Sequence, residues 1–237
     1  MSGSKDPDAK NIPEHRGGYA SPPCMMHELD PTYSGLSEAE AVDPQQRRDV
    51  MRWRKAERQR LIQERLALPG KKRLAQGGSI AERLLAELGD PTGLVVSAYW
   101  PFRGEPDLRG LLKQVIAAGG QAALPVVIEK GQPLIFRAWR PKDPLERGVW
   151  NIPIPQAGAP EVVPDVVISP VVGFDPRCFR LGYGGGFFDR TLAAMPEKPR
   201  VFGVGYSIAA IPTIFPQPHD IPMDCIITEE ATHHPQK

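Results

Sequence analysis

A glycine-rich segment flanked by charged residues is the part of the sequence best suited to chemistry. Residues 180–190 read Arg-Leu-Gly-Tyr-Gly-Gly-Gly-Phe-Phe-Asp-Arg. Glycine lacks a Cβ, so this backbone can take positive φ angles and approach a ligand closely, and its amides can converge on an anion. Phe187 to Leu192 suit the first turns of a helix, whose N-terminus would add its dipole. The segment therefore predicts a phosphate-binding loop, and a glycine-rich turn without a ligand stays open as the alternative.

The charged neighbours of this loop fit the same chemistry. Arg180 and Arg190 flank it with positive charge, and Asp189 is placed to hold a magnesium ion beside phosphates. The loop is not a P-loop, because no Gly-Lys-Ser/Thr sequence closes it. It is not a dinucleotide-binding fingerprint either, because Phe187 stands where that motif needs its last glycine.

The loop and four further motifs resemble the 5-formyltetrahydrofolate cyclo-ligase family. Its signature reads roughly Gly-Phe-Asp, a short spacer, then Arg-Leu-Gly-x-Gly-x-Gly-Tyr-Tyr-Asp. Here Gly173-Phe174-Asp175 precedes the glycine loop at the expected distance. The other matches are a basic helix with Arg54/Lys55 and Arg58, the segment Trp100 to Asp107, Trp150-Asn151-Ile152-Pro153, and His219 to Asp224. The resemblance extends in order over about residues 45–230.

The resemblance implies an ATP-dependent enzyme that uses magnesium and takes 5-formyltetrahydrofolate as its substrate. Residues implied to bind ATP are Arg54, Lys55, Arg58, Arg180, Leu181, Gly182, Tyr183, Gly184, Gly185, Gly186, Phe187 and Phe188. Residues implied to bind the folate are Trp100, Glu105, Trp150, Tyr183, Gly184, Gly185, Gly186 and Phe187, with Glu105 holding the pterin ring. Asp189 and Asp224 are the implied magnesium ligands. Trp150 fits either a core anchor or a lid over a flat ligand.

The implied reaction makes 5,10-methenyltetrahydrofolate with release of ADP and phosphate, after ATP phosphorylates the formyl oxygen. Such a transfer needs charge neutralisation and alignment more than a protein nucleophile. The sequence departs from the family where Phe187 and Phe188 replace two tyrosines. An alternative is therefore a paralogue that binds a nucleotide or heterocycle without this reaction. A third interpretation, an RNA- or partner-binding module, is weaker because aromatic residues do not interleave with the basic ones.

The pattern of the remaining residues predicts one α/β domain. A helix is expected from Asp43 as N-cap to Leu68, and a second from Ser79 to Leu88. Buried strands are expected at residues 94–99, 122–128, 134–139, 166–169, 201–206 and 225–228. A strand, a helix and a strand at this spacing imply a right-handed crossover. We expect a mostly parallel sheet with helices on both faces and a ligand site at the carboxyl ends of the strands. Residues 140–164 are expected to be irregular.

Composition excludes several classes of protein. With 41% hydrophobic and 24% charged residues, the 237-residue chain reads as a soluble globular protein. A formal net charge of +1 argues against broad attraction to nucleic acids or membranes. Three cysteines predict a reducing compartment, and no signal peptide or membrane span is apparent, so the expected location is the cytoplasm. The sequence does not determine the oligomeric state, and a monomer is slightly favoured.

The ends of the chain are expected to lie outside this domain. Residues 1–42 are rich in Gly, Pro, Ser and charge and predict a disordered N-terminal extension. Within them, Cys24 and His27 have the spacing of half a zinc site, but no second pair of ligands follows, so a docking segment or a plain tail is favoured. The predicted domain covers residues 43–231, and residues 232–237 are expected to form a tail.

Overall fold

The computed structural model describes residues 43–236 of the chain. The chain divides into two units between Val50 and Met51, and the α/β fold belongs to the second unit. The expected extension at residues 1–42, including Cys24 and His27, lies outside the described residues. Among the helices described, none combines the length and the apolar composition that a bilayer-spanning segment needs.

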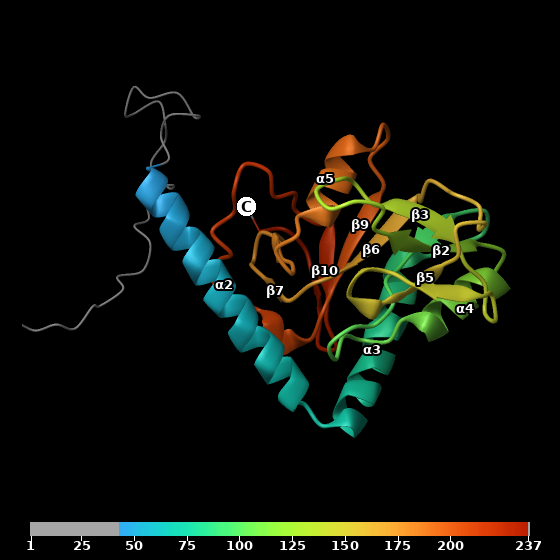
Figure 1. The fold of residues 1–237 in the computed structure, drawn as a ribbon. Coiled ribbons are helices and arrows are strands. Elements are labelled where there is room, and N and C mark those ends of the chain that lie inside the picture. Colours follow the sequence, from blue (N-terminus) through green and yellow to red (C-terminus); the bar gives the residue numbers. More distant parts are fainter. Residues whose placement is uncertain (1–42, 237) are drawn as a thin grey trace, which may run out of the picture. The chain divides into compact units, whose positions relative to one another are not determined.

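A seven-stranded mixed sheet forms the centre of the α/β unit, in the order β11-β10-β9-β6-β1-β2-β3 (Figure 1). Its five inner strands run parallel, and an antiparallel strand closes each edge. The strands are β1 (Val95–Ser97), β2 (Gln121–Val126), β3 (Ile135–Ala138), β6 (Val166–Pro170), β9 (Arg200–Val204), β10 (Cys225–Ile227) and β11 (Thr232–His233). This arrangement confirms the predicted mostly parallel α/β sheet.

Helices cover both faces of the sheet because apolar side chains of its strands alternate between them. Val166 and Ile168 of β6 pack with α3 (Gly70–Leu88) and α4 (Arg109–Ala117) in the main core. Val167 between them faces Phe188 of α5 (Phe187–Ala194), on the other side of the sheet (Figure 1). Parallel strands buried on both faces explain the continuous apolar runs in the sequence.

Two hairpins and the part of the long helix α2 (Pro44–Ala67) from Met51 onward complete the unit. Asp43 begins that helix as expected, since its Oδ1 accepts the Gln45 N–H at 2.9 Å. The hairpins are β4 (Leu145–Arg147) with β5 (Pro153–Pro155), and β7 (Gly173–Phe174) with β8 (Arg180–Leu181). Short 3₁₀ turns lie at Val149–Asn151 and Ser207–Ala209.

Three predictions of local structure are wrong. The second helix begins at Gly70 rather than Ser79, because Pro69 ends α2 and directly precedes a new helix in which Gly77 and Gly78 are tolerated. Residues 140–164 are not irregular throughout, since they contain the β4–β5 hairpin, whose prolines are tolerated in a two-stranded edge ribbon. Residues 232–233, expected in a tail, pair with β10 as β11.

Candidate active site

A pocket opens at the carboxyl edge of the parallel strands. Its floor contains Tyr99 and Trp100 after β1, Val127 after β2, and Pro170 at the end of β6. Parallel strands end at the same edge, so these residues meet although they are far apart in sequence. The glycine loop between β8 and α5 forms one wall, and α2 contributes Met51, Arg54 and Arg58. The position is the one that the sheet topology predicts for a ligand.

The glycine loop is open toward the pocket. Gly184 and Gly186 have φ angles of +93° and +63°, which side chains with a Cβ rarely adopt. A Cβ on Gly184 would lie 3.4 Å from the Arg58 guanidinium, and one on Gly185 would overlap the Phe187 ring. Within the described chain, the amides of residues 182–186 donate no hydrogen bond to another backbone group. The loop therefore presents unpaired N–H groups just before the N-terminus of α5, as an anion site requires.

Two buried ion pairs lie beside the loop. Arg180 Nη2 is 2.7 Å from Asp189 Oδ2, with side chains 6% and 13% exposed. Arg54 Nη2 is 2.8 Å from Asp220 Oδ2 in an equally buried pair. In the part of the chain that the structure describes, the Nε atoms of Arg54 and Arg180 are buried without a hydrogen-bond partner. These are donors that an anionic ligand could satisfy.

Arg58 completes this group of cations. Its Nε donates to the Gly182 carbonyl at 2.7 Å, which anchors α2 to the glycine loop. Burial and the charge of Arg54 lower the pKa of the Arg58 guanidinium. Burial likewise lowers the pKa of Arg180, against the pull of Asp189. Arginine remains charged in proteins, so these side chains bring positive charge into a buried region, where the loss of hydration costs free energy. We call Arg54, Arg58, Arg180, Asp189 and Asp220 the charged end of the pocket.

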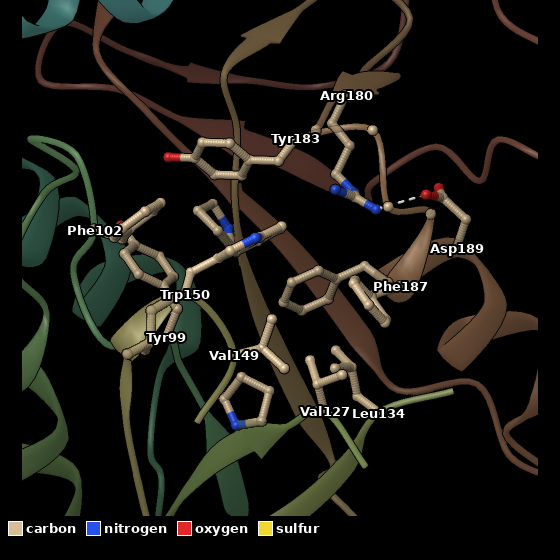
Figure 2. A pocket seen from close by; sticks show the side chains of 18 of the residues that line it. Tyr99, Phe102, Val127, Leu134, Val149, Trp150, Arg180, Tyr183, Phe187 and Asp189 are labelled. Carbon is tan, nitrogen blue, oxygen red and sulfur yellow. Dashed lines mark hydrogen bonds and ion pairs between the residues drawn. The ribbon is translucent and has the colours of Figure 1, made fainter. Parts of the chain in front are cut away.

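Aromatic rings form the opposite part of the pocket (Figure 2). The rings of Phe102, Trp150 and Tyr183 have mutual centroid distances of 5.9–6.1 Å, and Phe102 and Trp150 are nearly parallel. Figure 2 shows these rings on one side of the cavity and the Arg180–Asp189 pair on another, with Phe187 between them. Trp100, Phe102, Trp150, Tyr183 and Glu105 are called the aromatic end below.

Trp150 is carried on a strained segment between β4 and β5. It has φ +57° and Asn151 has φ +61°, so two consecutive non-glycine residues lie in the left-handed region. The Gly148 N–H donates to Ile152 O at 2.9 Å and closes the turn. The Trp150 side chain is 53% exposed while it lines the pocket. Trp150 is therefore not a core anchor, and its position over the pocket fits a lid.

Glu105 is the buried acid of the aromatic end. It is 7% exposed, and its Oε2 accepts the Phe102 N–H at 2.8 Å. Its Oε1 accepts the Tyr183 O–H at 2.7 Å. Burial raises the pKa of Glu105 from 4.5 to about 7, although Arg65, Tyr183 and the Phe102 amide pull the pKa down. Burial also raises the pKa of Tyr183 well above its usual value, so the phenol stays protonated and donates a hydrogen bond to Glu105.

The sequence of this chain matches known proteins along most of its length. The family model described as the 5-formyltetrahydrofolate cyclo-ligase family matches residues 50–229. The chain belongs to this family. A 5-formyltetrahydrofolate cyclo-ligase from Escherichia coli K12 is 30% identical over 173 residues, which cover 70% of this chain and 94% of that protein. One from Mycolicibacterium smegmatis is 31% identical over 144 residues, 58% of this chain and 74% of that protein.

Two solved structures share the fold of the cyclo-ligase family with this chain. The 5,10-methenyltetrahydrofolate synthetase of Aquifex aeolicus has a TM-score of 0.67 at 24% identity, with 78% of this chain and 93% of that chain covered. The 5,10-methenyltetrahydrofolate synthetase of Mycoplasma pneumoniae has a TM-score of 0.62 at 23% identity, with 74% and 98% covered. At these identities the likeness supports the single α/β fold.

Most of the residues implied by the family resemblance come together in the pocket. They are Arg54, Arg58, Trp100, Glu105, Trp150, Arg180, Gly182, Tyr183, Gly184, Gly185, Gly186, Phe187, Phe188 and Asp189. Lys55 does not join them: it is exposed on the next position of α2 and is not among the described residues that line the pocket. Leu181 is fully buried in the core beside Leu61 and Ile214, so only its backbone belongs to the loop.

Asp224 also lies elsewhere, which contradicts its expected place beside Asp189. It precedes β10, at the amino end of a parallel strand, whereas the pocket lies at the carboxyl ends. Its Oδ2 accepts the Val201 N–H at 2.7 Å, and its Oδ1 is 3.6 Å from Lys198 Nζ. The carboxylate thus caps the start of β9, as a turn acid does. The structure does not bring the two implied magnesium ligands together.

The pocket does not contain a preformed protein cage for magnesium. Among the described residues, no group of three or more His, Cys, Asp or Glu side chains is close enough to share a metal ion. Both oxygens of Asp189 are occupied, one by Arg180 and the other by the Ile221 N–H at 3.3 Å. Asp220 is likewise paired with Arg54. The donor set fits an anion held by arginines and amides better than a metal bound by protein alone.

Sequence reasoning missed several lining residues, including Tyr99, Phe102, Val149, His219 and Asp220. Phe102 belongs to the Trp100–Asp107 match and lies three positions before Glu105, a signal that could have identified it. Asp220 lies in the His219–Asp224 match, four positions before Asp224, which the resemblance implies as a magnesium ligand. The apolar lining residues carry no sequence signal, because a buried strand end looks the same whether it meets a core or a cavity.

Proposed function

We propose that this protein catalyses the ATP-dependent conversion of 5-formyltetrahydrofolate to 5,10-methenyltetrahydrofolate, with release of ADP and phosphate. The observation that carries the proposal is a single pocket with two chemically different ends. One end gathers arginines and unpaired glycine amides, and the other gathers aromatic rings around a buried carboxylate. A nucleoside triphosphate and a flat heterocycle are the ligands that these two surfaces complement.

The charged end is assigned to the phosphates of ATP. Arg58 and Arg180 supply cations, and the glycine loop supplies amides at the start of α5. Arg54 and Arg180 each have a buried Nε without a partner within the described chain, and both residues line the pocket. Arginine and backbone donors of this kind stabilise charge that spreads over the transferred phosphoryl group.

The aromatic end is assigned to the folate. Trp150 and Phe102 offer ring faces for stacking, and Glu105 offers an acceptor in an otherwise apolar wall. A pterin carries ring and exocyclic N–H groups on one edge, which is the complement of a carboxylate. An ionised Glu105 is the stronger acceptor, so binding is expected to improve as the pH rises through about 7.

The chemistry then requires the formyl oxygen to lie between the two ends. A formamide is a poor electrophile because its oxygen leaves badly. Transfer of the γ-phosphoryl group to that oxygen converts it to a phosphate leaving group, and ADP is released. The neighbouring folate nitrogen attacks the activated formyl carbon and a new C–N bond closes the ring. The C–O bond breaks as phosphate departs, and the attacking nitrogen loses its proton to the departing phosphate or to water. The chain's own contribution is to align the two substrates, neutralise charge and exclude water.

Magnesium is assigned as a companion of ATP and not as a resident metal. Phosphates and water supply most ligands of Mg²⁺ in such sites, with one or two carboxylates from the protein. Asp189 is the carboxylate next to the glycine loop, and it is engaged with Arg180 in the structure. No step of the proposal depends on a protein-bound metal.

The paired phenylalanines favour one competing function, a nucleotide-binding relative that does not close the folate ring. Phe187 lines the pocket under the Arg190 guanidinium, and Phe188 lies under that of Arg180 at 5.0 Å. Neither ring offers a hydroxyl. Arg180 lines the pocket and can donate hydrogen bonds there, whereas Arg190 is not among the described residues that line it.

The test is a turnover assay with purified protein, magnesium, ATP and 5-formyltetrahydrofolate. We expect the near-ultraviolet absorption of the methenyl product to rise, with ADP and phosphate formed in equal amounts. Omission of either substrate serves as the control. Binding of ATP without product from this folate would reject the cyclo-ligase function in favour of the non-cyclising relative.

A further inference from the structure

Arg65 on α2 is a buried cation outside the charged end of the pocket. Arg65 is not among the described residues that line the pocket, yet each of its guanidinium nitrogens points to a segment that contributes to the pocket lining. Nη2 donates to the Tyr183 hydroxyl at 2.5 Å, Nε donates to Arg103 O at 3.0 Å, and Nη1 lies 3.4 Å from Val171 O. One side chain therefore connects α2, the turn after β1, the end of β6 and the glycine loop.

The donor-only character of arginine determines the direction of the hydrogen bonds beyond it. Because Arg65 can only donate, the Tyr183 oxygen accepts from it and directs its single O–H to Glu105 Oε1, 2.7 Å away. Arg65, Tyr183 and Glu105 thus form a chain that ends at the pocket. Glu105 uses one lone pair for Tyr183 and one for the Phe102 amide, so further lone pairs remain for a ligand.

The same arginine supports the strained turn that carries Glu105. Arg103 and Gly104 have φ angles of +47° and +77°, and the Glu105 N–H bonds back to Phe102 O at 3.1 Å. A non-glycine residue in the left-handed region is held there by its surroundings. The Arg103 carbonyl accepts a hydrogen bond from the Arg65 guanidinium. The same guanidinium therefore both orients the Tyr183 hydroxyl and holds this turn.

We propose that Arg65 is a positioning residue for the folate: through Tyr183 and the turn at Arg103 it holds Glu105 as a charged acceptor for the N–H edge of the pterin ring. The inference rests on the proposed function. Glu105 is faced by Arg65 from α2, Tyr183 from the glycine loop, Tyr99 after β1 and Tyr206 after β9. Arg65 is the only cation among these described groups, so its loss leaves the carboxylate without a compensating charge.

The experiment measures KM for 5-formyltetrahydrofolate and for ATP from pH 6 to 9 in wild type, Arg65→Gln, Arg65→Lys and Tyr183→Phe. For wild type, KM for the folate is expected to fall as the pH rises through about 7. In Arg65→Gln and Tyr183→Phe the midpoint should move up by about one pH unit, which raises KM for the folate about fivefold at pH 7. KM for ATP should change less than about twofold. In Arg65→Lys the midpoint should lie between those of wild type and Arg65→Gln, because lysine keeps the charge but not the planar donor geometry.

A double variant and a control separate positioning from stability. If Arg65 acts through Tyr183, the midpoint shift of the double variant Arg65→Gln/Tyr183→Phe should equal the larger of the two single-variant shifts and not their sum. Arg60→Gln is the matched control on the same helix, because Arg60 is exposed and its ion pairs within the described chain are with Glu57 and Glu64. If Arg65→Gln does not fold, the Tyr183→Phe midpoint alone decides.

A lowered melting temperature with both KM values raised together and an unmoved midpoint would overturn the inference. An unmoved midpoint in Tyr183→Phe would do the same. Wild type without turnover would reject the proposed function instead. In that case the pH midpoint of 5-formyltetrahydrofolate binding, followed by tryptophan fluorescence, still tests Arg65, since Trp100 and Trp150 line the pocket.

Discussion

The charged end and the aromatic end of the pocket share the glycine loop but are held in different ways. The charged end is made of side chains that pair with one another, Arg180 with Asp189 and Arg54 with Asp220. The aromatic end depends on backbone turns with positive φ, at Arg103 and at Trp150, and its Trp150 ring is half exposed. Changes at the charged end should therefore cost stability as well as binding, while changes to the exposed ring of Trp150 should act mainly on binding.

Arg180→Ala is expected to have the largest effect. It leaves Asp189 buried without its partner, and breaking one side of a buried ion pair costs about 3–5 kcal/mol. Urea unfolding at pH 7.5 should show this loss in the free energy of unfolding. Arg177→Ala is the control, because Arg177 is exposed on the same hairpin. A loss below about 1 kcal/mol would mean that the charged end is not held by this pair.

Glu105 is expected to make stability depend on pH in the opposite direction from an ordinary surface acid. Its pKa is raised from 4.5 to about 7, so the folded protein holds the proton more tightly than the unfolded chain. Its contribution to the free energy of unfolding is therefore largest below about pH 4.5 and declines as the pH rises to about 7. The full decline corresponds to roughly 3 kcal/mol.

Wild type and Glu105→Gln, unfolded side by side from pH 4.5 to 8, measure this contribution. The difference in unfolding free energy, wild type minus variant, should fall with rising pH, because glutamine does not titrate. The folate KM of Glu105→Gln should lose its pH dependence over the same range. A difference that stays constant with pH would show that Glu105 has an ordinary pKa.

Asp224→Asn should have a small effect on turnover, although the family resemblance implies that Asp224 is a magnesium ligand. The carboxylate is 44% exposed, caps the Val201 amide, and faces an exposed lysine. Surface pairs of this kind contribute about 0–1 kcal/mol, and an asparagine oxygen can still accept the Val201 N–H. We expect turnover and its magnesium dependence within about twofold of wild type. A large loss of magnesium-dependent activity would restore the original assignment of Asp224 as a metal ligand.

Phe188→Tyr should have the smallest effect. The Phe188 ring packs under Arg180 and against the core around Val167, and a hydroxyl added there gains at most one hydrogen bond. That gain is about 0.5–1.5 kcal/mol if a partner is found. Turnover should rise by less than about tenfold or stay unchanged. A fall in turnover would indicate that the ring is packed too tightly to accept the hydroxyl.

The order of elements and the position of the loop were predictable because they depend on local signals. Apolar runs that contain Val indicated β1, β6 and β9, and glycines between a strand and a helix indicated the ligand loop. The N-cap at Asp43 was equally local. Two of the predictions of local structure that were wrong concern elements that form by pairing with another segment of the chain. β11 forms because β10 offers it an edge, and the β4–β5 hairpin forms because Pro153 and Pro155 of β5 pair with Arg147 and Leu145 of β4.

The candidate site shows the same division. Residues that act through their own type, such as Arg58, Glu105 and the glycines, were found from the sequence. Asp224 and Asp220 are both aspartates in one short segment, and only the direction of the chain through the fold decides which faces the pocket. Arg65 lies on the basic helix α2, but its role depends on Tyr183, 118 positions away in the sequence. Such long-range partners leave no pattern in a single sequence.

The central claim is that the charged end binds ATP and the aromatic end binds the folate, and one comparison of steady-state constants tests it. KM for each substrate is measured in wild type, Arg58→Ala and Trp150→Ala under identical conditions. Arg58→Ala should raise KM for ATP about tenfold or more, because a charged hydrogen bond contributes about 1.5–3 kcal/mol, with little change for the folate. Trp150→Ala should raise KM for the folate with little change for ATP. If each variant changes both constants equally, or if the two effects are exchanged, the assignment of the two ends is contradicted.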